Sequence, residues 1–250
     1  FSYDTRNLSY GSLQSNGINL SVFLKKYKII KGDRVALLSY NKIEFAEILY
    51  ATSKLGAIVM PINFRLSKKE IASIVKDAKP KFFLYERVFL KTINYLVKNN
   101  FLDKNMVLCI DTKNYYKLLT KSKNTYPLNL KNSKKNDDWS LMYTSGTTGK
   151  PKGVIRNHEG YYYLSSITSI ELNIKKEDKA LLVMPLCHAN SFNFFCAYIF
   201  AGASIYLYSK PNFNCKYFFK VLKKHHCTFT SFVPTHFIIM LDYIKKYNKN

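Results

Sequence analysis

The chain has 250 residues, of which 47% are hydrophobic and 16% aromatic, so it is long enough to bury a large core. Its formal net charge of +23 raises nucleic acid as a partner, but only five of the 39 basic residues are Arg, and the Lys residues are scattered rather than gathered in one stripe. Codon bias of an AT-rich genome explains this Lys content better than specific nucleic-acid binding does. Binding to nucleic acid would weaken steeply with added salt.

Cysteine usage and hydropathy point to a cytoplasmic protein. The five cysteines form no C-x-x-C pair, which is typical of reduced thiols. The sequence also lacks a cluster of ligands at zinc-site spacing, so it predicts no metal site. Residues 180–209 carry no formal charge and are long enough to cross a bilayer, but Pro, His, Asn and Gly interrupt them. We therefore expect a buried strand, loop, helix and second strand there and no transmembrane segment. Peripheral membrane contact stays open.

Apolar runs alternate with helical patterns along the chain, which predicts an α/β fold of mostly parallel sheets flanked by helices. Residues 41–44 and 67–70 have the pattern of capping boxes at helix starts. The expected strands are 34–40, 57–62, 81–85, 106–111, 139–144, 153–157, 180–184, 203–208 and 229–233. The expected helices are 41–55, 67–78, 88–98, 158–172, 191–201, 215–225 and a last one from Thr235.

The stretch 120–138 separates two groups of these elements. It is rich in Lys, Asn and Ser, with a single Pro, which is typical of an exposed connection. We therefore expect a first α/β subdomain over 1–119, a linker over 120–138 and a second α/β subdomain over 139–250.

The segment 143–154, YTSGTTGKPKGV, is the most informative part of the sequence. Glycines let backbone N–H groups converge on an anion, hydroxyls add donors, and lysine supplies the countercharge. A Walker A loop is excluded, because Lys150 is followed by Pro151 rather than by Ser or Thr. The sequence therefore predicts a phosphate-binding loop at the end of a strand, and a plain polar turn is the alternative.

This segment resembles the phosphate-binding signature of the AMP-forming adenylating enzymes, which include acyl-CoA synthetases, luciferases and peptide-synthetase adenylation domains. Further segments resemble the same family in the same order, so that the resemblance runs from about residue 8 to about residue 245. These segments are 8–13, 31–36, 54–63, 184–188 and 232–235. The resemblance implies the N-terminal portion of the adenylate-forming enzyme fold.

The resemblance also implies site residues. Lys152 and His188 are the expected catalytic residues, and His188 would orient the substrate carboxylate. Lys150 stands at a position that varies in the family and is left out. The residues expected to bind ATP phosphates are Thr144, Ser145, Gly146, Thr147, Thr148, Gly149 and Lys152. The residues expected to line the acid pocket are His188, Asn190, Phe194, Phe232 and Val233, with ordinary core packing as the alternative for the last four.

The implied activity joins a carboxylic acid, ATP and CoA, with Mg²⁺ as cofactor. The acid would attack the α-phosphate of ATP and the acyl-adenylate would then pass to the thiol of CoA. No Tyr-Gly-x-Thr-Glu segment follows residue 235. We therefore expect the N-terminal part of an acyl-CoA synthetase, inactive alone, whose C-terminal part holds most Mg²⁺ ligands. A truncated, non-catalytic nucleotide-binding or interaction module is the alternative, and the identity of the acid stays open.

Overall fold

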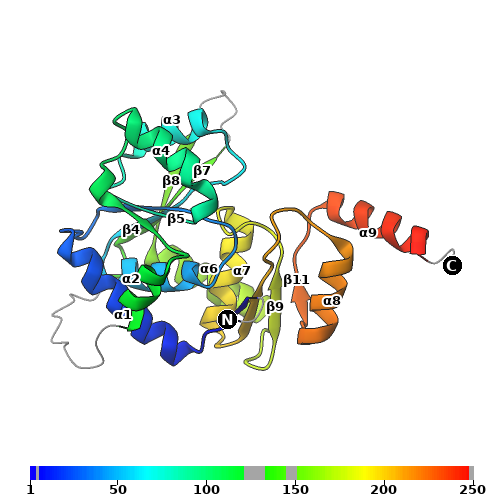
Figure 1. Cartoon of the computed structure of the whole chain (residues 1–250). Helices are drawn as coiled ribbons and strands as arrows, with labels where there is room; N and C mark the ends of the chain where they lie inside the picture. Colours follow the sequence, from blue (N-terminus) through cyan, green and yellow to red (C-terminus); the bar gives the residue numbers. More distant parts are fainter. Residues whose placement is uncertain (4–5, 121–132, 145–150, 248–250) are drawn as a thin grey trace. The chain divides into compact units, whose positions relative to one another are not determined.

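The computed structural model describes residues 1–3, 6–120, 133–144 and 151–247 (Figure 1). The chain divides into two compact units. One comprises residues 8–39 and 44–161 and is called the six-stranded unit here; the other comprises 1–7, 40–43 and 162–250 and is called the five-stranded unit. The two units interleave along the chain, whereas the sequence analysis placed a boundary in the connection 120–138.

The six-stranded unit is built on one largely parallel sheet with the strand order β6-β5-β3-β4-β7-β8. The strands from β6 to β7 are parallel, and β8 pairs with β7 in the antiparallel sense. Their bounds are β3 Arg34–Leu38, β4 Ile58–Pro61, β5 Phe82–Tyr85, β6 Val107–Cys109, β7 Asp138–Thr144 and β8 Lys152–Asn157. The apolar runs of β3 to β5 are buried on both faces, as expected for parallel strands covered by helices.

Helices cover both faces of this sheet, with α3 and α4 on one face and α1 and α2 on the other (Figure 1). Ala36 and Leu38 of β3 pack with Ile71 of α3 and Ile93 of α4 in one core cluster. The helix bounds are α1 Tyr10–Lys26, α2 Glu44–Leu55, α3 Lys68–Ala78, α4 Leu90–Lys98 and α5 Lys113–Thr120, with short 3-10 turns at Arg87–Phe89 and Lys104–Met106.

No helix is expected over residues 10–26 from the sequence, yet α1 forms there and packs closely on α2. Two glycines and several Ser and Asn residues lower its helix propensity. Gly17 explains why a poor helix former stands there, because a Cβ at this position would lie 2.5 Å from the Tyr50 ring of α2. Close helix packing therefore outweighs local propensity in α1.

The five-stranded unit has the strand order β11-β9-β10-β1-β2, in which β11, β9, β10 and β1 are parallel and β2 is antiparallel. The bounds are β1 Ser2–Tyr3, β2 Arg6–Asn7, β9 Lys179–Leu182, β10 Ser204–Leu207 and β11 Phe229–Thr230. In Figure 1, α7 Ala189–Phe200 lies on one side of this sheet and α8 Cys215–His225 lies on the other. Helix α9, Pro234–Tyr247, packs against the α8 side, and the remaining helix is α6, His158–Glu171.

The α/β class, the two mostly parallel sheets and the flanking helices predicted from the sequence are confirmed. The capping box at residues 67–70 is confirmed as well: the Glu70 N–H donates to Ser67 Oγ, and the Ser67 N–H donates to the Glu70 carboxylate. The capping box predicted at residues 41–44 is wrong. Helix α2 begins at Glu44, and the Asn41 amide is bound to other backbone groups instead.

Glu44 and Glu47 of α2 are buried, although carboxylates usually face solvent. The Tyr115 hydroxyl donates to Glu47 and the Tyr116 hydroxyl donates to Glu44, and both tyrosines come from α5. Burial raises the pKa of Tyr115 well above its ordinary value, so Tyr115 stays a neutral donor. These pairs fix α5 to the six-stranded unit.

Along the described stretches, no helix combines the length and the apolar character that crossing a bilayer requires.

Candidate functional site

The β7–β8 hairpin presents two of the predicted phosphate-binding residues. Thr144 is the last residue of β7 and lies opposite Lys152, the first residue of β8. The Thr144 hydroxyl donates to the Lys152 carbonyl at 3.4 Å, and both residues are exposed. The predicted residues Ser145, Gly146, Thr147, Thr148 and Gly149 lie outside the described residues.

The hairpin is fixed to the six-stranded unit along β7. Leu141 is buried in the core cluster with α3 and α4, and the Tyr143 hydroxyl donates to the Asp77 carboxylate of α3. Gly153 of β8 faces these two side chains so closely that a Cβ would lie 2.8 Å from Leu141 Cδ1 and 3.2 Å from Tyr143 Cζ. The spacing of Thr144 and Lys152 is therefore set by a well-packed antiparallel pair.

The second predicted site segment follows β9 in the five-stranded unit. The Asn41 side chain is buried, and its Nδ2 donates to the carbonyls of Met184 at 2.9 Å and Leu182 at 3.3 Å. Its Oδ1 accepts from the Leu186 N–H at 2.8 Å. Asn41 therefore holds the backbone that leads from β9 to His188, a role that its distance along the sequence hid from sequence reasoning.

His188 stands at the start of α7. Its backbone is extended, its N–H donates to the Pro185 carbonyl at 3.0 Å, and its carbonyl accepts from the Phe192 N–H at 3.1 Å. The imidazole makes no capping hydrogen bond to the helix, and the side chain is half-buried. The position at a strand-to-helix turn agrees with the location expected for a ligand-binding residue in an open α/β sheet.

The other predicted pocket residues lie where α7 meets β11 and the chain after it. The Ser231 hydroxyl donates to Asn190 Oδ1 at 3.2 Å, and the Phe194 ring packs against Phe229 at 4.8 Å between centroids. The Phe232 ring lies among aromatic side chains of the core cluster beside α8 and α9, and the Val233 side chain is exposed. The structure thus brings Asn190 and Phe194 to β11, whereas the Phe232 ring is engaged in core packing.

Three cysteines, Cys109, Cys215 and Cys227, have thiols of raised pKa. Burial raises the pKa of the Cys109 and Cys227 thiols to about 11, and it raises the pKa of Cys215 as well. Such thiols are protonated at neutral pH and are poor nucleophiles. Within the ranges that the structure describes, no group of three or more His, Cys, Asp or Glu side chains is placed to hold a metal ion.

Comparison with known proteins shows which protein family the chain resembles. The model of the AMP-binding enzyme family matches residues 1–250. Curated relatives include a 4-hydroxybutyrate–CoA ligase of Metallosphaera sedula, 26% identical over 98% of this chain and 46% of the relative, and an indoleacetate–CoA ligase of Aromatoleum aromaticum, 29% identical over 96% of this chain and 47% of the relative. The chain spans about half the length of the curated relatives it matches.

Solved structures share the fold. The inhibitor-bound N-terminal domain of FACL13 from Mycobacterium tuberculosis matches with a TM-score of 0.81 at 23% identity, over 96% of this chain and 60% of that chain. The o-succinylbenzoate CoA synthetase of Bacillus subtilis in complex with AMP matches with a TM-score of 0.80 at 23% identity, over 96% and 59% of the two chains.

The fold of this chain is thus that of the N-terminal domains of adenylate-forming enzymes. With the family model matching its whole length, the chain belongs to the AMP-binding enzyme family, and the predicted family resemblance is confirmed.

Proposed function

We propose that the chain is the N-terminal part of an ATP-dependent carboxylic acid–CoA ligase. In this proposal the enzyme activates a fatty or related acid as its acyl-adenylate and transfers the acyl group to CoA. The observation that carries the proposal is the β7–β8 hairpin, with Thr144 opposite Lys152 at the two ends of the glycine- and hydroxyl-rich segment. The names of the relatives, which are ligases joining different carboxylic acids to CoA, support the acid–thiol chemistry.

The hairpin suits a phosphate group for electrostatic reasons. The Thr144 side chain supplies a hydroxyl donor, the Lys152 side chain supplies an ammonium group, and the seven residues between the strands, 145–151, add hydroxyls and backbone N–H groups. Hydrogen bonds to charged groups contribute about 1.5–3 kcal/mol each, so a few of them stabilise a bound triphosphate by several kcal/mol. We assign ATP phosphate binding to Thr144, Ser145, Gly146, Thr147, Thr148, Gly149 and Lys152.

We assign the acid to the segment after β9. His188 is the N-cap residue of α7, and in the proposed site its imidazole orients the carboxylate. Asn190 and Phe194 follow on the same helix, and Phe232 and Val233 come from the chain after β11. We assign these four residues to the acid pocket, where one methylene of the acid changes the binding free energy by only ~1–3 kcal/mol.

In the first proposed step an oxygen of the carboxylate attacks the α-phosphorus of ATP. The bond from this phosphorus to the bridging oxygen breaks, and pyrophosphate leaves with the electron pair. In the second step the CoA sulfur attacks the acyl carbon, its proton is released, and AMP leaves. Lys152 and the hairpin donors would stabilise the negative charge that moves onto pyrophosphate, and His188 would hold the attacking carboxylate in place.

Mg²⁺ would neutralise part of the phosphate charge when bound. In this proposal most of its protein ligands would come from the C-terminal part of the enzyme, as the family resemblance implies. We place the enzyme in the cytoplasm, in line with its free cysteines, with peripheral membrane contact as a route for a fatty acid and no specific nucleic-acid partner.

The first test measures ATP binding to the 250-residue chain by calorimetry. We expect Lys152→Ala to weaken binding by about tenfold, which corresponds to losing one charged hydrogen bond at the low end of its range. Lys69→Ala removes the same charge from the exposed surface of α3 and is the matched control, expected to bind like the parent. Equal binding by parent, Lys152→Ala and Lys69→Ala would contradict the assignment of the hairpin.

The second test measures acid-dependent ATP–pyrophosphate exchange by the protein expressed from its complete gene, over acetate, medium- and long-chain fatty acids and aromatic acids. We expect exchange with one acid class, weakened in Lys152→Ala and His188→Ala, and none from residues 1–250 alone. ATP binding without exchange for any acid would favour the alternative, a nucleotide-binding or interaction module. Exchange by residues 1–250 alone would show that these residues are sufficient for adenylation.

A further inference from the structure

The first residues of β7 contain a β-bulge. Asp138 pairs with Asn157 and Ser140 pairs with Arg156, so the register shifts at Trp139, which is the additional residue on β7. Bulges redirect a side chain and increase the local twist, and they are frequent beside active sites. At this bulge the redirected side chain is the single tryptophan of the chain.

Contacts on several sides hold the Trp139 side chain. Its Nε1 donates to Ser53 Oγ in the last turn of α2 at 2.6 Å. Its ring stacks on His158 at 5.2 Å between centroids and meets the edge of Tyr161 at 4.7 Å. Tyr161 in turn shares a buried hydrogen bond of 3.0 Å with Ser140. The bulge is therefore locked to the end of α2 and to the start of α6.

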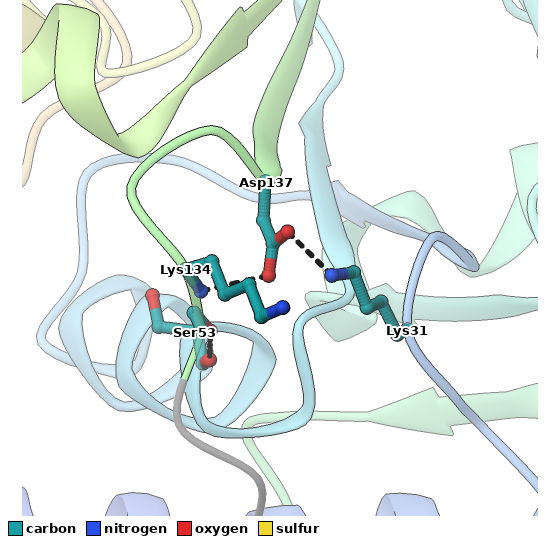
Figure 2. Close-up of polar contacts among 5 residues, drawn as sticks. Lys31, Ser53, Lys134 and Asp137 are labelled. Carbon is teal, nitrogen blue, oxygen red and sulfur yellow. Dashed lines mark hydrogen bonds and ion pairs between the residues drawn. The ribbon is translucent and has the colours of Figure 1, made fainter.

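The residues just before the bulge are also tied to the sheet (Figure 2). Asp137 forms an ion pair with Lys31, which precedes β3, and its other oxygen accepts from the Lys134 N–H at 2.8 Å. The Ser133 hydroxyl donates to the Ser53 carbonyl. Ser53 thus receives one hydrogen bond from each side of the turn 134–137.

These ties lie where β7 joins the parallel sheet. Ser140 pairs with Val59 of β4 on one side and with Arg156 of β8 on the other. Thr144 and Lys152 lie at the opposite end of the hairpin. A register slip of one residue at the bulged start of β7 would turn every side chain of the strand to the other face, so contacts that fix the bulge also fix the direction of the Thr144 side chain.

We propose that Lys31, Ser53 and Asp137 are positioning residues for the Thr144–Lys152 end of the hairpin. We call these three residues, together with Trp139, the β7 anchor. The inference rests on the proposed function, because it assigns the anchor an effect on ATP binding. The anchor residues do not touch the nucleotide in this proposal; they act by fixing the bulged start of β7.

The test compares ATP binding and tryptophan emission in the parent and five variants, all made from residues 1–250. Lys31→Ala breaks the ion pair, and Lys31→Arg keeps it. Asp137→Asn removes the charge but retains an oxygen for the Lys134 N–H, and Ser53→Ala removes the acceptor of the Trp139 N–H. Lys81→Ala is the matched control, because Lys81 forms a comparable ion pair with Asp33 at 2.7 Å in the same unit.

We expect Lys31→Ala, Asp137→Asn and Ser53→Ala to weaken ATP binding about three- to tenfold, which corresponds to weakening one charged hydrogen bond at the end of the hairpin. Ser53→Ala should also shift the Trp139 emission, because the indole loses its hydrogen-bond acceptor. Lys31→Arg should restore binding to within twofold of the parent. Far-UV circular dichroism checks that each variant is folded.

Binding by Lys31→Ala and Ser53→Ala that equals binding by Lys81→Ala would overturn the positioning role. If Lys152→Ala alone weakens ATP binding, the proposed function stands and only this inference fails. If the parent does not bind ATP, both fail together. If Lys31→Arg is as defective as Lys31→Ala, the ion pair is not the operative contact and the role of Lys31 is overturned.

Discussion

The segment after β9 and the end of the β7–β8 hairpin both carry predicted site residues, and they are held in opposite ways. After β9, the buried side chain of Asn41 binds the backbone directly at residues 182, 184 and 186, immediately before His188. In the hairpin, Thr144 and Lys152 are exposed, and the structure fixes the strands at Leu141, at Tyr143 and at the bulged start.

Because the two regions are held differently, we expect a single substitution to lower the free energy of unfolding by different amounts in each. A segment held by one buried amide depends on a single side chain, because its loss leaves buried polar groups without partners. A hairpin is held by several contacts along its length. The loss of any one of them therefore lowers the free energy of unfolding by a smaller amount. Four substitutions or conditions test this comparison, in order of decreasing expected effect.

Asn41→Ala should have the largest effect on the free energy of unfolding. The substitution leaves the N–H of the buried residue Leu186 without its acceptor and removes two bonds to carbonyls, which we expect to cost about 2–4 kcal/mol. Urea unfolding followed by circular dichroism measures the change. Asn212→Ala, at an exposed position in the same unit, is the control. A loss no larger than that of the control would remove the distinction between the two segments.

Gly153→Ala should destabilise the hairpin by about 1–3 kcal/mol through overpacking. The added Cβ would lie 2.8 Å from Leu141 Cδ1, and Leu141 is confined by the core. Gly11→Ala is the control, since a Cβ there meets only Ser9 Oγ at 4.0 Å and helix propensity favours alanine. Unfolding followed by Trp139 emission measures the difference, and equal stability of the two variants would show that the hairpin relaxes freely.

Tyr143→Phe should cost about 0.5–1.5 kcal/mol, the net contribution of one ordinary hydrogen bond. The substitution deletes the hydroxyl that donates to Asp77 and keeps the ring against Gly153. Tyr163→Phe, on the exposed face of α6, should change nothing measurable. A cost above that of Asn41→Ala would reverse the comparison, because the hairpin would then depend on one contact.

The smallest effect concerns pH and His158. Burial lowers the pKa of His158 below its usual 6.5, and the nearby Asp137 carboxylate partly offsets this. A lowered pKa means that the folded state binds fewer protons than the unfolded state, so the stabilisation is complete above pH 6.5 and is lost as pH falls toward the folded pKa. Urea unfolding followed by Trp139 emission between pH 7.5 and 5.5 should show this slope.

His158→Gln is the control for this slope, because glutamine does not titrate. The stability of His158→Gln should vary less with pH over the same window. Asp137, whose pKa is held below its ordinary value by Lys31 and by the Lys134 N–H, stays ionised in that window. An identical slope in parent and variant would assign the pH dependence to other groups.

Local patterns sufficed for much of this chain. Continuous apolar runs such as 35–38 and 82–85 marked strands buried on both faces, because a parallel sheet covered by helices hides such runs completely. The segment 143–154 marked a strand, a turn and a returning strand, and it also supported the family resemblance that the comparison confirms. These features can be predicted from the sequence because each depends on residues that are close together along the chain.

Three features escaped the sequence reasoning because their partners are remote. Helix α1 has poor propensity and forms because Gly17 lets Tyr50 pack against it. Asn41 had the pattern of a helix cap, but it binds backbone more than 140 residues away. The turn 134–137 belonged to an expected exposed linker, yet Asp137 pairs with Lys31 and Ser133 with Ser53.

Composition and local order in the sequence thus predicted the fold class and the family, which are confirmed, and a phosphate-binding role for residues 144–152, which stays a prediction. Folding alone revealed which side chains hold that segment and the one before His188. The reason is physical: propensity and periodicity act between residues a few positions apart, whereas a buried hydrogen bond or ion pair needs two groups that only the folded chain brings together.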